Sequence, residues 1–271
     1  MWDGNVYLHS DIKVNLSSSP AIFDQMMALK GKCFRQQKGR ITQRIRLGKK
    51  SYFIKQHFGV GWKEILKNLV QLRWPVLSAK NEWLAIHKLQ ALGIDVPTVV
   101  AYGRRGSNPA SLQSFIMMEE LAPVMSLEDL CQTWQIFPPS FALKRSLIEQ
   151  VAYIARTLHQ NGLNHRDFYL CHFLLDTVKK AEVENRLPHL KLYLIDLHRV
   201  QIRHLTPRRW IIKDLAGLYF SSKDIGLTQR DLYRFMKSYH GKSLREIMDA
   251  DNGFWIKVLR RGEKLYCDLI K

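Results

Sequence analysis

Two aspartates and one lysine stand where they could carry out phosphoryl transfer. Asp167 closes a His-Arg-Asp triplet in "NHRDFYLCHFLL", Asp196 ends the run "LKLYLID", and Lys55 lies inside "YFIKQHF". Phosphoryl transfer needs a carboxylate to orient the attacking hydroxyl and take its proton. It also needs a second carboxylate to hold Mg²⁺ against the phosphates and a cation to neutralise them. Asp167, Asp196 and Lys55 suit these three tasks in that order.

Glu82 is the candidate partner of Lys55. An ammonium inside an apolar strand is costly to desolvate unless it meets a carboxylate or a phosphate. Glu82 lies on a helical segment two elements later, and a strand lysine paired with a helix glutamate orders the nucleotide phosphates in protein kinases. Taken singly, such a lysine is usually a solvated edge residue and such a glutamate a surface charge. The chain order Lys55, Glu82, Asp167, Asp196 is what favours an active site.

The first 120 residues must position Lys55 and Glu82, and they are strand-rich. The runs "ITQRIRL" and "YFIKQHF" around the turn "GKKS" predict a basic hairpin. Helices are expected over "GWKEILKNLVQL" and over "AKNEWLAIHKLQALG", which ends at Gly93. Two further strands follow in "VPTVVAYG" and "LQSFIMMEEL". The polar residues 1–21 are expected to form a loose leader or a short edge element.

The chain after Pro123 is mainly helical and must position the two aspartates. Ser126 and Asp129 have the spacing of a capping box. Apolar residues at spacings of three and four predict one long amphipathic helix from Ser140 to Gly162. Two short strands, "FLL" and "LKLYLID", flank a polar insert around "KKAEVENRLPH".

This order of elements resembles that of protein kinases. We expect a two-lobed α+β, protein-kinase-like fold, with a leader over 1–21, a strand-rich N-lobe over 22–121 and a helical C-lobe over 122–271. The side chains of Lys55, Asp167 and Asp196 are then expected to converge on a cleft between the lobes.

The chain is strongly basic, with 42 Lys and Arg against 24 Asp and Glu, a formal net charge of +18. Such a surface attracts an anionic partner, which charge alone does not identify. The basic residues are spread along the chain without a nucleic-acid-binding signature, so no nucleic-acid partner is expected. The four cysteines are scattered and predict neither a zinc site nor a disulfide framework. No signal segment and no apolar run of roughly 18 residues occurs, which favours a cytoplasmic protein.

Several longer motifs resemble one family. The runs "KSYFIKQHFGVGWKEILKNL", "PVLSAKNEWLAIHKL", "NHRDFYLCHFLL", "IDLHR", "PRRW" and "KDLAGLYFSS" are similar to the lipopolysaccharide core heptose(I) kinases of Gram-negative bacteria. The likeness extends from about residue 22 to the C-terminus. It implies ATP- and Mg²⁺-dependent phosphorylation of heptose I on lipid A-core at the cytoplasmic face of the inner membrane, and hence a peripheral location there. Acyl carrier protein, which is strongly acidic, is a further partner that the family implies.

The resemblance also implies roles for individual residues. Asp167 would be the catalytic base, with Arg166 beside it in the catalytic triplet, and Asp196 would be the metal ligand. Lys55 with Glu82 would clamp the phosphates. The run "MEEL" would be the hinge that meets adenine, through Met118, Glu119 and Leu121.

The sequence departs from the protein-kinase pattern in four places. His172 stands five residues after Asp167, where protein kinases carry a metal-binding Asn. Since Mg²⁺ prefers oxygen ligands, His172 either joins Asp196 at the metal, makes a hydrogen bond there, or is bonded to loop carbonyls. No Gly-rich loop precedes the hairpin, Leu-His replaces Phe-Gly after Asp196, and no Ala-Pro-Glu motif follows.

In place of the last motif stands a basic run, which is either an acceptor-binding surface or a solvated loop. Arg side chains bind phosphate in a forked geometry, and Trp210 offers a face for sugar stacking. The candidate acceptor-binding residues are Arg199, Arg203, Arg208, Arg209 and Trp210, with Lys213 next to them. Asp214 resembles the buried aspartate that supports the catalytic loop of kinases. The segment from Trp62 to Trp74 either lies on an anionic membrane or packs between the lobes.

Two rival functions stay open. A kinase for another inner-core sugar, such as the acidic sugar Kdo, would carry the same phosphate-handling residues. A catalytically inactive kinase-like scaffold that binds acyl carrier protein or lipid belongs to another class, and the intact set of Lys55, Asp167 and Asp196 speaks against it.

Overall fold

The computed structural model describes residues 2–3, 6–13, 22–37, 39–70, 76–177 and 190–270. The chain forms two compact units. Unit 1 contains residues 1–88 and 97–121, and unit 2 contains residues 89–96 and 122–271. The predicted polar insert and the end of the segment from Trp62 to Trp74 lie outside the described residues.

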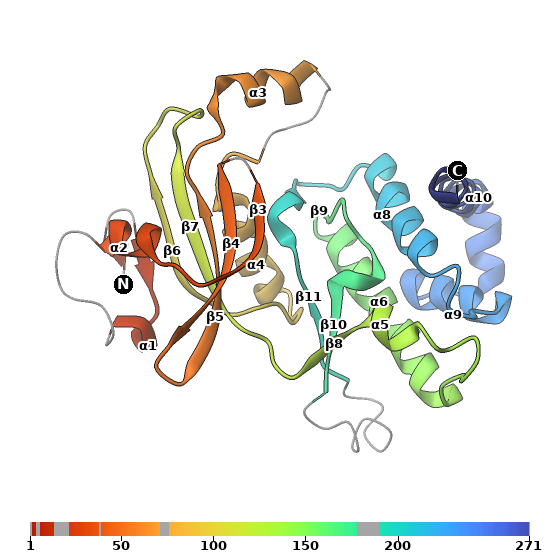
Figure 1. Ribbon diagram of the computed structural model, residues 1–271. Coiled ribbons are helices and arrows are strands. Elements are labelled where there is room, and N and C mark those ends of the chain that lie inside the picture. The colour runs from red at the N-terminus through yellow and green to blue at the C-terminus, as the bar shows by residue number, and fades with distance from the viewer. Residues whose placement is uncertain are drawn as a thin grey trace. The chain divides into compact units, whose positions relative to one another are not determined.

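Unit 1 is built on one antiparallel sheet of seven strands in the order β1-β2-β6-β7-β5-β4-β3 (Figure 1). The strands are β1 (Trp2–Asp3), β2 (Val6–Leu8), β3 (Lys32–Gln37), β4 (Arg40–Leu47), β5 (Lys50–His57), β6 (Val99–Arg105) and β7 (Gln113–Glu119). The predicted hairpin is confirmed, since β4 pairs with β5 from Arg40 opposite His57 to Leu47 opposite Lys50. The N-terminal segment was expected to form a loose leader or a short edge element. Part of it is β2, a short strand next to the sheet edge that pairs with β6.

Side-chain alternation along β5 decides which face carries Lys55. Ile54 is opposite Met117 of β7, and both are fully buried in a core that also contains Phe23 and Met26 of α2 (Ile22–Ala28). Lys55 is opposite Ile116 and therefore points to the other face of the sheet.

Helix α4 (Lys80–Ala91) covers the face that carries Lys55. Trp83 of α4 stacks on Tyr102 of β6 at 4.7 Å between ring centroids, and Tyr102 is the register partner of Ile116. The helix ends where the sequence predicts, with Gly93 in the left-handed region at φ 74°. The remaining helices of unit 1 are α1 (Ser10–Lys13) and α3 (Gly61–Val70).

Helix α3 forms as predicted, but its apolar face is uncovered. Of its apolar residues, Ile65 is buried, while Leu66, Leu69 and Val70 are exposed. These three side chains are therefore not part of the core of unit 1.

Unit 2 is mainly helical. Its described residues form the α-helices α5 (Leu127–Cys131), α6 (Phe141–Gln160), α8 (Arg208–Ser221), α9 (Gln229–His240) and α10 (Leu244–Ile270). The hydroxyl oxygen of Ser126 accepts from the backbone N–H of Asp129, which is the Ser126 half of the predicted capping box, and its O–H donates to the Asp129 carboxylate. Ser140, where the long helix is predicted to begin, caps α6 by accepting from the backbone N–H of Leu143. Among the described residues, no helix combines the length and the apolar character that crossing a membrane requires.

Two small sheets of unit 2 hold the loops that carry the aspartates. One sheet has the order β11-β10-β8, from β8 (Val124–Ser126), β10 (Phe173–Asp176) and β11 (Leu192–Leu194). The other pairs β9 (Leu163–Asn164) with β12 (Gln201–Ile202). Gly162 is required just before β9, because a Cβ there, at φ 78°, would lie 1.9 Å from the backbone oxygen of Arg203.

Candidate active site

Lys55 and Glu82 form the ion pair that the sequence predicts. The Lys55 Nζ atom lies 2.6 Å from Oε1 of Glu82, and their side chains are 16% and 3% exposed. Strand alternation brings Lys55 to the face that α4 covers, and Glu82 stands in the first turn of that helix. The second carboxylate oxygen of Glu82 is buried without a hydrogen-bond partner among the described residues.

The candidate hinge residues lie at the end of β7 and just after it. Met118 is buried and pairs with Phe53, and Glu119 pairs with Tyr52. The Glu119 carboxylate lies 3.0 Å from the ammonium of Lys50. Leu121 is partly buried and is the last residue of unit 1.

Asp167 lies in a loop that a buried carboxylate fixes. Asp214 of α8 accepts hydrogen bonds from the backbone N–H groups of His165 at 2.6 Å and Arg166 at 2.8 Å. Arg166 has φ 77°, a left-handed conformation that a residue with a Cβ adopts only when its surroundings hold it. The supporting role predicted for Asp214 is visible in these contacts.

The carboxylate of Asp167 is paired with Arg199. The Arg199 Nη1 atom lies 2.6 and 2.9 Å from the two carboxylate oxygens of Asp167, whose side chain is 17% exposed. Arg199 follows Asp196 in the short 3₁₀ helix η3 (Leu197–Arg199). The two aspartate-bearing loops of unit 2 are therefore joined by a direct ion pair.

Asp196 stands between two histidines. Its Oδ1 atom is 2.6 Å from Nδ1 of His198, and its Oδ2 atom is 3.7 Å from Nε2 of His172. His172 uses its other ring nitrogen, Nδ1, to bond the backbone oxygen of Asp167 at 2.6 Å. Asp196 also has a positive φ, 59°, so the chain turns sharply at the residue that presents the carboxylate. Among the described residues, no group of three or more His, Cys, Asp or Glu side chains is placed to hold a metal ion.

The predicted basic run gathers around one aromatic ring. Four cations lie 5.1 to 5.7 Å from the centroid of Trp210, from Arg166, Arg203, Arg209 and Lys213. Burial, with Arg166 and Arg199 nearby, lowers the pKa of Lys213, and burial with Arg199 nearby lowers the pKa of Arg166. A cluster of cations that repel one another in this way would be relieved by an anion.

The members of the run differ in what they contact. Arg203 donates to the side chains of Asn164 and Gln201, both at 2.6 Å, and so ties β9 to β12. Arg208 lies over the ring of Phe254, 5.3 Å from its centroid.

Sequence reasoning missed two residues of this site. His198 enters the sequence analysis only as the residue in place of the glycine of Phe-Gly, although a histidine two residues after an aspartate can fold back on that carboxylate. Asn164 is fully buried and receives Arg203, a contact between distant positions that no local spacing indicates.

The fold and these contacts define the class of protein. Superposition on a solved structure of WaaP in complex with acyl carrier protein gives a TM-score of 0.81 at 42% identity, covering 96% of this chain and 99% of that chain. WaaP has a protein-kinase-like fold, and this chain shares it. The predicted fold class is confirmed, and the chain is a phosphotransferase of the sugar-kinase type.

The family follows from the sequence comparisons. Residues 24–239 match the lipopolysaccharide kinase (Kdo/WaaP) family, and the chain belongs to it. It is 48% identical over 244 residues to the lipopolysaccharide core heptose(I) kinase WaaP of Pseudomonas aeruginosa, covering 90% of each chain. It is 49% identical over 243 residues to the protein of that name from Escherichia coli K12, again covering 90% of each. Membership of a kinase family implies the use of ATP.

Proposed function

We propose that this protein transfers the γ-phosphoryl group of ATP to a hydroxyl of heptose I in the inner core of lipopolysaccharide. In this reaction the acceptor oxygen forms a bond to phosphorus, the bond from phosphorus to the β-phosphate oxygen breaks, and the acceptor proton passes to the Asp167 carboxylate. The observation that carries the proposal is the Asp167 loop, which Asp214 holds in a left-handed turn at Arg166. Similarity to heptose(I) kinases over 90% of the chain supports the choice of acceptor.

We assign the nucleotide to Lys55, Glu82 and the residues Met118, Glu119 and Leu121. The ion pair between Lys55 and Glu82 supports this assignment, because it orients the ammonium that would neutralise the phosphates.

Asp196 is the proposed Mg²⁺ ligand. Mg²⁺ is usually held by one or two carboxylates, with water and the substrate phosphates completing its coordination, so the absence of a three-residue cluster among the described residues is compatible with it. Bound there, the ion would neutralise charge on the phosphates. Since Mg²⁺ prefers oxygen ligands, we assign His172 to holding the loop through its bond to the Asp167 backbone, with Nε2 facing the carboxylate of Asp196.

The acceptor would meet the cations around Trp210. Lipid A-core carries phosphate groups, which suit Arg208, Arg209 and Lys213. Arg199 would also serve here, and its present pairing with Asp167 means that an acceptor or nucleotide phosphate would compete with that carboxylate for the guanidinium. The contacts of Arg203 with Asn164 and Gln201 favour a supporting role for that residue.

The test is phosphate transfer by the purified full chain, with ATP, Mg²⁺ and defined core acceptors, followed by location of the phosphate by mass spectrometry. We expect Asp167→Asn to lower kcat by about 10²-fold or more, the scale of a lost general base. Phosphate on Kdo would replace the proposed acceptor with the rival one. Near-wild-type turnover of the variant would discard Asp167 as the base, and no turnover by the wild type would favour the scaffold alternative.

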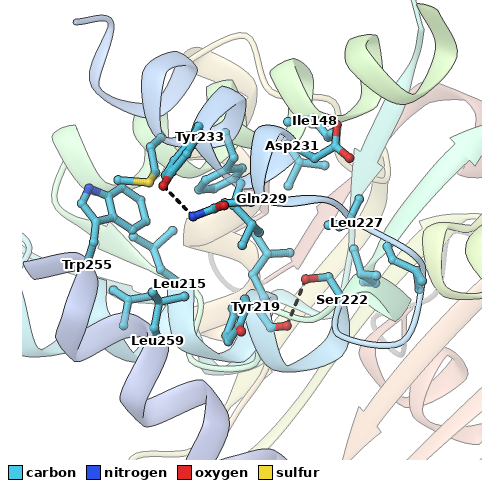
Figure 2. Close-up of a pocket in the computed structure, with 18 of the residues that line it drawn as sticks. Ile148, Leu215, Tyr219, Ser222, Leu227, Gln229, Asp231, Tyr233, Trp255 and Leu259 are labelled. Carbon is cyan, nitrogen blue, oxygen red and sulfur yellow. Dashed lines mark hydrogen bonds between the residues drawn. The ribbon is translucent and has the colours of Figure 1, made fainter. Parts of the chain in front are cut away.

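Acyl carrier protein is the proposed protein partner, and two adjoining features of unit 2 support it. One is an apolar cavity of about 280 Å³ among α6, α8, α9 and α10, with Leu215, Trp255 and Leu259 in its wall (Figure 2). The other is a groove lined by Arg145, Arg230, Arg234 and Lys237, with Glu149, Tyr233 and Leu244. Tyr233 lines both. An acidic carrier of an apolar chain suits a basic groove beside an apolar cavity, and a related protein has been solved with such a partner.

The peripheral location at the inner membrane is part of the same proposal. The acceptor is anchored in lipid, so the enzyme must work at a membrane surface. The net charge of +18 supports attraction to anionic lipid.

A further inference from the structure

Helix α3 carries an apolar face that the described residues of unit 1 leave exposed. Trp62, Leu66, Leu69 and Val70 are 55%, 57%, 44% and 84% exposed. Their spacing of four, three and one residues places all four on one side of the helix. Only Ile65, at the border of that side, is buried, at 5% exposed. A helix of ten residues thus shows four large apolar side chains to its surroundings.

The N-terminal end of α3 is held in place, although its apolar face is exposed. The backbone N–H of Gly61 donates to the backbone oxygen of Ala110 at 2.9 Å, in the connection between β6 and β7. A Cβ at Gly59 would lie 2.6 Å from the same oxygen, so the chain passes very close to this connection. Figure 1 shows α3 beyond the ends of β6 and β7 and not laid across the sheet. The apolar face is therefore presented at a defined place on unit 1.

Cations border the apolar face. Lys63 and Lys67 are four residues apart, share one side of the helix next to Leu66 and Val70, and are both exposed. An apolar face with an aromatic residue and with lysines along its edge is typical of helices that lie in the interfacial region of a bilayer. The lysines suit anionic headgroups, which attract each nearby cation.

A protein partner explains the face less well. A stable interface buries about 800 Å² on each partner, more than one face of a ten-residue helix supplies. A twofold contact through α3 would also bring Lys63 and Lys67 of two copies together, in a chain whose net charge is already +18.

We propose that α3 is a membrane-binding helix, which inserts Trp62, Leu66, Leu69 and Val70 among the lipid headgroups of an anionic bilayer. Lys63 and Lys67 then contact the phosphates. This assignment deepens the peripheral location proposed above and does not depend on the phosphoryl-transfer reaction.

The experiment is co-sedimentation of the full chain with vesicles of phosphatidylcholine alone or mixed with phosphatidylglycerol. We expect binding to the anionic vesicles, and a loss of about tenfold or more in Leu66→Glu with Leu69→Glu, since each removes an apolar side chain from the bilayer. Lys63→Gln with Lys67→Gln should weaken binding to anionic vesicles only. Leu269→Glu with Ile270→Glu, at positions of α10 that are more exposed than Leu66 and Leu69, is the control with the same change of charge and should bind as the wild type does.

Three further readouts, which are tryptophan emission, melting temperature and turnover, make the result decisive. Trp62→Phe should remove a blue shift of tryptophan emission that anionic vesicles induce in the wild type. All variants should keep the wild-type melting temperature and their turnover of a lipid-free acceptor, which separates membrane binding from the proposed reaction. The proposal would be overturned if the wild type did not bind anionic vesicles, or if the α3 variants bound them as well as the wild type does. The proposal would also be overturned if the wild type were a dimer and the α3 variants were monomers, since α3 would then bind a second copy of the chain.

Discussion

At the scale of single residues, Asp214 decides whether Asp167 is correctly presented. Its two oxygens receive the backbone N–H groups of His165 and Arg166, and its Oδ2 atom lies 3.4 Å from Nε2 of His159. The Asp214 side chain is fully buried, so each of these contacts is shielded from water. A left-handed backbone at Arg166 persists only because these bonds hold it.

Asp214→Asn tests this at the residue scale. The amide retains the shape but presents N–H groups to a backbone donor, and a buried unsatisfied donor costs about 1–3 kcal/mol. We expect a loss of that size in the free energy of unfolding, measured with urea, and a fall in kcat larger than the change in the KM for ATP. Asp268→Asn, at an exposed position of α10, should change neither. Full activity of Asp214→Asn would show that the loop keeps its geometry without these bonds.

At the scale of elements, helices α6 and α9 are joined by ion pairs to one aspartate, Asp231. Lys144 of α6 lies 3.0 Å from Asp231 of α9, and Arg234 lies 2.8 Å from the other oxygen of Asp231. Burial opposes ionisation of Asp231, but hydrogen bonds from Thr228 and Lys144 outweigh it and lower the pKa of its carboxyl group. The two helices are thus held by an ionised aspartate, and their basic groove keeps a fixed shape.

The groove allows a prediction about acyl carrier protein. Arg230→Glu with Lys237→Glu reverses two exposed charges of α9, and rim charges mainly control the association rate and its dependence on salt. We expect the association rate constant for acyl carrier protein, measured by surface plasmon resonance, to fall about tenfold at low salt. Arg46→Glu with Lys49→Glu makes the same charge change on unit 1 and should have a much smaller effect. Equal losses in both variants would indicate general charge attraction and not this groove.

At the scale of the whole molecule, the net charge of +18 acts on every anionic ligand. Its field raises the local concentration of an anionic acceptor, and salt screens that field within a Debye length of about 8 Å at physiological ionic strength. The cations around Trp210 add a local contribution that salt screens less where they are partly buried.

These two contributions are separable by kinetics. We expect kcat/KM for a phosphorylated core acceptor to fall about tenfold between low and high salt. Arg208→Ala with Arg209→Ala should raise the acceptor KM and flatten this salt dependence, while the KM for ATP stays unchanged. An unaltered acceptor KM in this variant would remove the basic run from the acceptor site and leave it as a solvated surface.

Much of this protein is determined by local sequence. The hairpin of β4 and β5, the caps at Ser126 and Ser140, and the end of α4 near Gly93 follow from periodicity and from residues that favour one backbone conformation. The pairing of Lys55 with Glu82 also follows, because a strand lysine on an apolar face needs a partner and the next long helix supplies one. Convergence of Lys55 with Asp167 and Asp196 stays a prediction.

Only the tertiary structure decided the contacts that distant positions make. Arg199 and Arg203 stay predicted acceptor-binding residues, and only the fold shows that Arg199 also contacts Asp167 and that Arg203 contacts Asn164. The sequence also did not decide whether α3 lies on a membrane or packs between the lobes. Amphipathic spacing shows that a helix has an apolar face but not what covers that face. Spacing along the chain fixes the direction of a side chain relative to its own element. Which groups lie opposite depends on how the elements pack, and that is a property of the whole chain.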